Sequence, residues 1–160
     1  MLFLLMALHS PAQVTPAETI TIAVKYLNAD ISDGRVPFFA KKIIKDGKGE
    51  KIYLIDPLSL YNGCLGAVFV YNEIKIVTLE KEYASLNEAQ TDLDAMLTSV
   101  KQLYPLIKLS TTKTGIGDDP VKFFVLYVNS AKIISLVSAS IKEQLNVTPE
   151  KRYKMHLEIQ

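Results

Sequence analysis

The spacing of apolar residues between Ser85 and Tyr104 predicts a long amphipathic helix. Apolar side chains recur at steps of three and four residues, which places them in one stripe along a helix. Ser85 and Glu88 have the spacing of a capping box, and Pro105 ends the helix because proline lacks a backbone N–H. A helix with one apolar face needs an apolar surface to pack on, so we expect the neighbouring strands to provide one.

A second helix is predicted at Pro16–Asp30. Thr15 and Glu18 have the same capping-box spacing, and Pro16 occupies the first helical position, where proline is best tolerated. Gly34 follows a polar segment after the apolar stripe and is typical of a helix end.

Shorter apolar runs predict the strands of a sheet. The expected strands are Lys51–Ile55, Leu65–Tyr71, Ile74–Leu79, Leu106–Thr111, Val121–Val128, Ala131–Ser140 and Tyr153–Gln160. Turn residues at Asp46–Gly49 and Asn72–Glu73 predict two hairpins, although the pattern of Val36–Lys45, the first arm of the first hairpin, fits neither a helix nor a strand cleanly.

Three of these segments carry a more specific prediction. Val121–Val128 is apolar on both faces, so we expect a central strand that is covered on both sides. Ala131–Ser140 is expected to return antiparallel, with a helix through Ile133–Leu145 as the alternative. Tyr153–Gln160 alternates strictly between apolar and polar residues, which indicates a half-buried strand with one polar face.

These elements predict an α+β fold, with a mainly antiparallel sheet of about six or seven strands and two amphipathic helices packed on it. The chain has 160 residues, and we expect residues 13–160 to form a single domain. We find no sequence repeat, heptad pattern or low-complexity segment.

The first residues predict export from the cytoplasm. Leu2–Leu8 is a short apolar run, and Ser10 and Ala12 stand two apart, as small residues do before a secretory cleavage site. Residues 1–12 are therefore interpreted as a signal peptide cut after Ala12, which implies a periplasmic or secreted protein without a transmembrane segment. The alternative is a cytoplasmic protein in which this run is a buried first element.

Charge and cysteine content exclude several classes of protein. The formal net charge is +1, and only Arg35 and Arg152 are arginines, which argues against a nucleic-acid partner. Cys64 is the only cysteine, so an intramolecular disulfide and cysteine-rich zinc sites are impossible.

Single reactive residues give weak signals of chemistry. His156 lies on the polar face of its predicted strand, and the sequence shows neither an orienting partner nor a nucleophile near it. We therefore interpret it as a surface histidine rather than a general base. Cys64 is interpreted as a small buried residue at the start of a strand rather than a nucleophile.

The loop Gly115–Asp119 is the most function-like segment of the sequence. Asp118 and Asp119 follow two glycines, and Lys113 lies close by, so these three residues are the candidate ligand-binding set. The loop matches no phosphate-binding or calcium-binding motif, and no metal site is expected.

The sequence therefore favours a non-catalytic binding module for an unknown small molecule or protein, with no catalytic residues and no cofactor. The alternative is a small hydrolase or lyase that uses the carboxylates of the Gly115–Asp119 loop. A third hypothesis is a homodimer that pairs through the edge of the Tyr153–Gln160 strand.

Overall fold

A computed structural model describes residues 13–29, 40–47, 50–71, 74–105, 108–111, 122–125 and 136–160. For residues 40–47, 108–111, 122–125 and 136 it describes the backbone alone. The predicted signal peptide at residues 1–12 lies outside the described residues. None of the described helices is long and apolar enough to cross a membrane.

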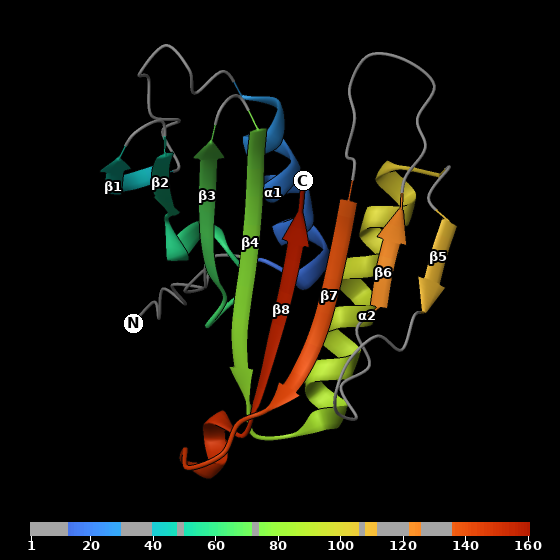
Figure 1. Ribbon diagram of the computed structural model, residues 1–160. Helices are drawn as coiled ribbons and strands as arrows, with labels where there is room; N and C mark the ends of the chain where they lie inside the picture. Colours follow the sequence, from blue (N-terminus) through green and yellow to red (C-terminus); the bar gives the residue numbers. More distant parts are fainter. Residues whose placement is uncertain are drawn as a thin grey trace, which may run out of the picture.

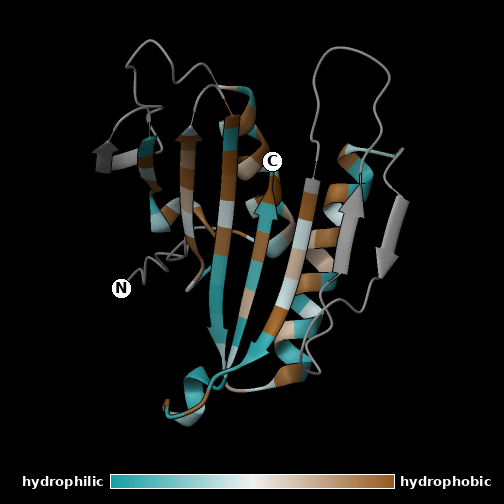
Figure 2. Ribbon diagram, viewed as in Figure 1, coloured by the Kyte–Doolittle hydropathy of each residue, from teal (hydrophilic) through white to brown (hydrophobic). Residues whose placement is uncertain are grey.

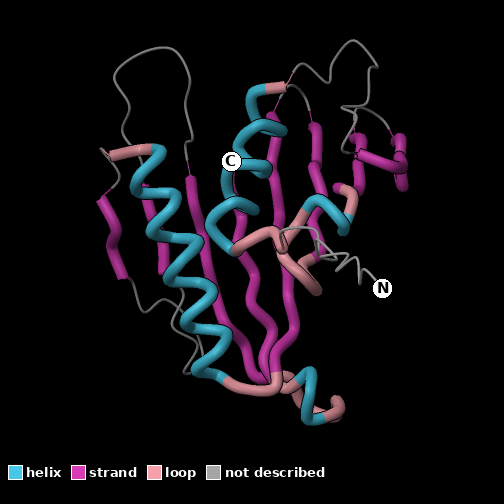
Figure 3. Tube along the Cα trace, turned by 180° about the vertical axis from the view of Figure 1, so that it is seen from behind, coloured by secondary structure: helices cyan, strands magenta, loops and turns pink. Residues whose placement is uncertain are grey.

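Two helices lie on one face of an antiparallel sheet, which confirms the predicted α+β class (Figures 1 and 3). The helices are α1 (Pro16–Asn28) and α2 (Leu86–Leu103). The strands, in chain order, are β1 (Ala40–Gly47), β2 (Glu50–Ile55), β3 (Leu65–Tyr71), β4 (Ile74–Tyr83), β5 (Lys108–Thr111), β6 (Lys122–Val125), β7 (Leu136–Glu143) and β8 (Tyr153–Ile159). Two short 3-10 helices are η1 (Pro57–Ser59) and η2 (Pro149–Lys151).

The described strands form one sheet in the order β1-β2-β3-β4-β8-β7-β6-β5. Five of them, β2, β3, β4, β8 and β7, form its continuous centre, where side chains are described. The expected count of about six or seven strands is therefore wrong, since the described strands number eight in all and five in this centre. The short runs Lys108–Thr111 and Lys122–Val125 extend the sheet beyond this centre on one side, and Ala40–Gly47 extends it on the other.

One order of elements occurs twice along the chain. In each half, a helix precedes four strands that pair in sequence, and the halves join where β4 lies antiparallel to β8. The sequence analysis found no repeat, because the repetition is one of topology. Both helices nevertheless begin with a hydroxyl residue three positions before a glutamate, Thr15 and Glu18 in one, Ser85 and Glu88 in the other.

The two helix starts differ in their capping. Thr15 and Glu18 form the predicted capping box, since the Glu18 backbone N–H donates to Thr15 Oγ1 at 3.2 Å and the Thr15 N–H donates to Glu18 Oε2 at 2.8 Å. The Ser85 side chain makes no capping hydrogen bond, so the capping box predicted there is wrong. The apolar stripe, rather than the cap, therefore sets the position of α2.

The hydrophobic core lies between the helices and the sheet. Helix α1 contacts β4, while α2 contacts β4, β8 and β7, and the helices also contact each other. The fully buried side chains on the strands include Val68, Leu79 and Leu157. At the helix contact, Ser99 Oγ of α2 donates to the Ala17 carbonyl of α1 at 3.1 Å.

Strand predictions have mixed outcomes. Both predicted hairpins are confirmed by antiparallel pairing of β1 with β2 and of β3 with β4. Leu136–Glu143 is a strand, so the alternative helix is wrong there. The half-buried strand near the C-terminus is also confirmed. The prediction that Val121–Val128 is a central strand is wrong, because β4 and β8 occupy the centre of the sheet and its described part, Lys122–Val125, lies next to the end strand β5.

The position of β8 also restricts how two copies of the chain could pair. This strand pairs with β4 along one edge and with β7 along the other. Its backbone groups are therefore occupied within the chain, and the predicted homodimer cannot form by adding a strand to Tyr153–Gln160.

Candidate functional site: the uncovered face of the sheet

The candidate ligand-binding residues from the sequence, Lys113, Asp118 and Asp119, lie outside the described residues. Their role stays a prediction. Among the described residues, the candidate site is a different region, the face of the sheet that is turned away from α1 and α2 (Figure 1). We call it the uncovered face.

Strand register decides which side chains share this uncovered face, because residues directly opposite each other in a sheet point the same way. At the β4 start, Tyr71 lies opposite Ile74, and Phe69 lies opposite both Ile52 and Ile76. Further along β4, Glu80 lies opposite His156, which in turn lies opposite Ser140. The final row contains Glu82, Lys154 and Lys142. The face therefore changes from apolar to charged along one strand (Figure 2).

The apolar end carries large exposed side chains. We define the apolar patch as Leu54, Phe69, Tyr71 and Ile74, whose exposed fractions are 38%, 37%, 49% and 47%. Ile52 and Ile76 lie between them and are half-buried. Cross-strand apolar pairs of this kind stabilise a sheet modestly, but contiguous exposed apolar surface is also typical of interaction sites.

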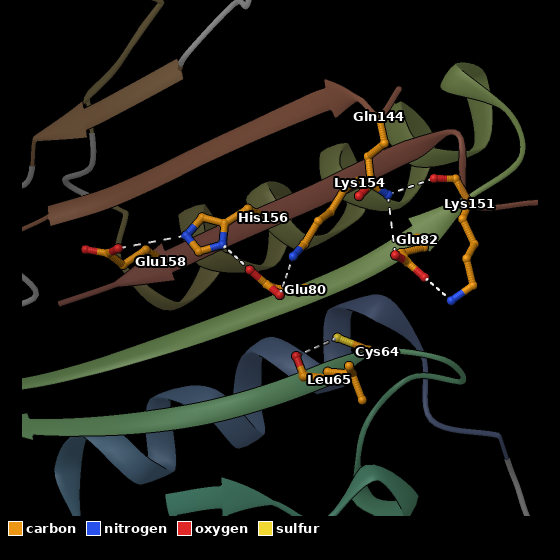
Figure 4. Close-up of polar contacts among 9 residues, drawn as sticks. All are labelled: Cys64, Leu65, Glu80, Glu82, Gln144, Lys151, Lys154, His156 and Glu158. Carbon is orange, nitrogen blue, oxygen red and sulfur yellow. Dashed lines mark hydrogen bonds and ion pairs between the residues drawn. The ribbon is translucent and has the colours of Figure 1, made fainter. Parts of the chain in front are cut away.

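The charged end carries ion pairs. We define the charged patch as Glu80, Glu82, Lys142, Lys154, His156 and Glu158. Lys154 Nζ lies 2.7 Å from Glu80 Oε2, and Lys151 Nζ lies 2.9 Å from Glu82 Oε2 (Figure 4). Gln144 joins this network by donating to the Lys151 carbonyl at 2.7 Å. Most of these charges are therefore balanced within the protein.

Glu80 is the centre of the charged patch. Partial burial of the carboxylate acts to raise its pKa, but hydrogen bonds from Lys154 and His156 outweigh burial and lower the pKa below the ordinary value of a glutamate. The carboxylate is therefore ionised at neutral pH and holds the side chains of Lys154 and His156 in place.

His156 has the orienting partner that the sequence did not show. His156 Nδ1 lies 3.1 Å from Glu80 Oε1, and Nε2 lies 3.8 Å from Glu158 Oε2 (Figure 4). Ser140 lies directly opposite on β7, and a cavity of about 450 Å³ is lined by Glu80, Ser140 and His156 together with Lys142 and Lys154. Ser140, His156 and Glu80 thus place a hydroxyl, an imidazole and a carboxylate in one row across the sheet. Enzymes that catalyse acyl transfer use the same three groups.

A second cavity lies on the opposite side of β4, against α2. It has a volume of about 440 Å³ and is lined by Lys81, Tyr61, Tyr83 and Asp92 among others. Lys81 Nζ lies 3.5 Å from the centre of the Tyr61 ring, 4.9 Å from that of Tyr83 and 3.7 Å from Asp92 Oδ2. Burial, followed by Asp92, raises the pKa of Tyr61 to about 12, so the phenol stays protonated at neutral pH.

Cys64 is buried, as the sequence predicted. Burial raises the pKa of the thiol to about 12, and the opposing effect of Lys81 is smaller. Because the thiolate is the reactive form, Cys64 is not a nucleophile at neutral pH.

Sequence reasoning did not single out Glu80 and Lys81, which line the two cavities. The signal that could have found them is the polar alternation Glu80, Lys81, Glu82 at the end of an apolar strand, which puts successive side chains on opposite faces. Within the described residues, no group of three or more histidine, cysteine, aspartate or glutamate side chains could hold a metal ion.

Within the part of the chain that the structure describes, the fold is that of a small α+β domain whose two helices both lie on one face of the sheet. No family model, curated protein or solved structure matches the chain.

Proposed function

We propose that this protein is an exported, non-catalytic binding module that holds a protein partner on the uncovered face of its sheet. The observation that carries the proposal is the apolar patch. Four large side chains there keep a third or more of their surface in contact with water. Burial of that area would contribute free energy to association, at about 25 cal/mol per Å² before the costs of binding.

A protein is a better match to this surface than a small molecule. The apolar patch lies on two hairpins of a sheet, and both cavities described above lie elsewhere. The charged patch borders it along β4, which reproduces the arrangement of an apolar interface centre with a polar rim.

Site-specific photocrosslinking tests the proposal in the native host. A photoreactive amino acid at position 69, in the apolar patch, is compared with one at Leu58, which is 85% exposed but lies on η1 outside the patch. We expect one discrete crosslinked protein from position 69 and none from position 58. Equal crosslinking from both positions would argue against the proposal.

The crosslinked partner, once purified, allows a quantitative measurement. Phe69→Lys is expected to weaken its binding by about tenfold or more, equivalent to about 1.4 kcal/mol, while Leu58→Lys leaves the affinity unchanged. Export is tested separately, by N-terminal sequencing of the secreted product, which is expected to begin at Gln13.

A second candidate function, acyl-ester hydrolysis, is favoured by the row of Glu80, His156 and Ser140. An active-site-directed fluorophosphonate tests it, with Ser140→Ala as the diagnostic variant and Ser138→Ala as a matched control from the same face of β7. Labelling that Ser140→Ala alone abolishes would replace the non-catalytic proposal. The alternative from the Gly115–Asp119 loop is tested by Asp118→Ala, which should abolish any turnover that depends on this carboxylate.

A further inference from the structure

We propose that Lys81 is a selectively reactive amine that binds aldehydes or ketones covalently, as an imine, in the cavity between β4 and α2. This site lies on the helix side of the sheet and does not depend on the protein interface proposed above. The ligand class follows from the chemistry of the amine, since a primary amine condenses with a carbonyl group.

The first support is the position of the lysine. Its side chain is only 14% exposed, yet Lys81 lines a cavity of about 440 Å³. A lysine on the open surface would be fully hydrated, whereas Lys81 has exchanged most of its water for two aromatic rings and one carboxylate. Burial of a lysine favours its neutral amine, which is the form that proteins use for imine formation.

Titratable and charged groups face the amine from three directions. Asp92 and Glu88 face it from α2, Tyr61 and Cys64 from the segment between η1 and β3, and Tyr83 from β4 itself. Glu82 of β4 and Glu150 of η2 also line the cavity. Burial lowers the pKa of Lys81, and the opposing effect of Asp92 and the other groups is smaller. The neutral, nucleophilic amine is therefore more accessible than at an exposed lysine.

The reaction balances without an oxidant or a reductant. The neutral Nζ attacks the carbonyl carbon, a C–N bond forms, and the carbonyl oxygen takes up a proton. Loss of that oxygen as water, with both hydrogens supplied by the amine, leaves a C=N bond, and hydrolysis reverses the step. Asp92, at 3.7 Å from Nζ, is placed to accept and return the proton.

Reductive trapping tests the proposal on the whole folded protein. Benzaldehyde serves as a neutral probe, sodium cyanoborohydride fixes any imine, and peptide mass spectrometry reports the labelled lysines. We expect Lys81 to be labelled several-fold faster than the exposed Lys101 of α2. We also expect its labelling to reach half-maximum at a lower pH than labelling at Lys101.

Two controls separate reactivity from a structural role. Lys81→Arg keeps the positive charge and the stacking on Tyr61 but cannot form an imine, so it should remove this one fast site and leave labelling elsewhere unchanged. In concentrated urea the preference for Lys81 should disappear. Labelling of Lys81 that is no faster than that of Lys101 in the folded protein would overturn the proposal, and so would a preference that persists in urea.

Discussion

The two halves of this protein share one order of elements but present different surfaces on the uncovered face. In the first half, β2, β3 and the start of β4 expose the apolar patch. In the second half, the described side chains of β7 and β8 meet the end of β4 in the charged patch. The helix-covered face of both halves carries the buried apolar core, and Lys81 of β4 also lies on this face, against α2.

This difference shows which part of the pattern is required by the fold. On the covered side, a polar residue loses its water at a cost unless a partner compensates, as Asp92 does for Lys81, so both halves carry mainly apolar buried side chains there. On the uncovered side the fold imposes no such requirement. The paired charges of the second half suit contact with water, whereas the exposed apolar residues of the first half do not, and the protein partner proposed above would cover them.

The largest expected effect is on the free energy of unfolding, and it compares two leucines, one on each face of the sheet. Leu79 of β4 is fully buried against the helices, whereas Leu54 of β2 belongs to the apolar patch. Leu79→Ala should lower the free energy of unfolding by about 2–5 kcal/mol because it leaves a cavity, and Leu54→Ala should lower it by about 1 kcal/mol or less. Urea denaturation of the purified protein measures both. Equal losses would mean that the apolar patch is covered in the isolated protein.

A smaller effect is expected at the helix starts, where the halves also differ. Thr15→Ala removes the side-chain acceptor of a complete capping box and should cost about 1 kcal/mol. Ser85→Ala removes a side chain that makes no capping hydrogen bond and should have little effect on the same denaturation curve. A loss at Ser85 equal to that at Thr15 would show that both caps form in solution.

Local patterns predicted the local structure well. The apolar stripes place α1 at Pro16–Asn28 and α2 at Leu86–Leu103, within two residues of the helices expected from the sequence. The alternation of Tyr153–Gln160 likewise predicted which residues of β8 are buried. In each case the side chain and the surface it packs on obey a period that can be seen within one segment.

Longer-range features were not predictable in the same way. Glu80 meets His156 only because β4 pairs with β8, and the register of that pair depends on contacts between segments far apart in the chain. The same limit hid the repeated topology and the order of the strands. It also explains why the sequence pointed to a glycine-rich loop, whose signal is local, and not to the uncovered face.

The smallest expected effect tests the charged patch through pH. The pKa of Glu80 is lower in the folded protein than the value of about 4.3 for an unfolded glutamate, so this carboxylate stabilises the fold above that pH. The contribution is lost as the pH falls through the folded-state pKa. Because Glu80 is partly exposed, Glu80→Gln should cost at most about 1 kcal/mol at pH 7 and less near pH 2.

Denaturation curves at both pH values check this prediction, with Glu158→Gln as the control. Glu158 approaches His156 no closer than 3.8 Å, whereas Glu80 contacts both His156 and Lys154. The pH-dependent difference should therefore be larger for Glu80→Gln than for Glu158→Gln. If the two variants behave alike, the charged patch is not organised around Glu80, and its ion pairs no longer account for the contrast with the apolar patch.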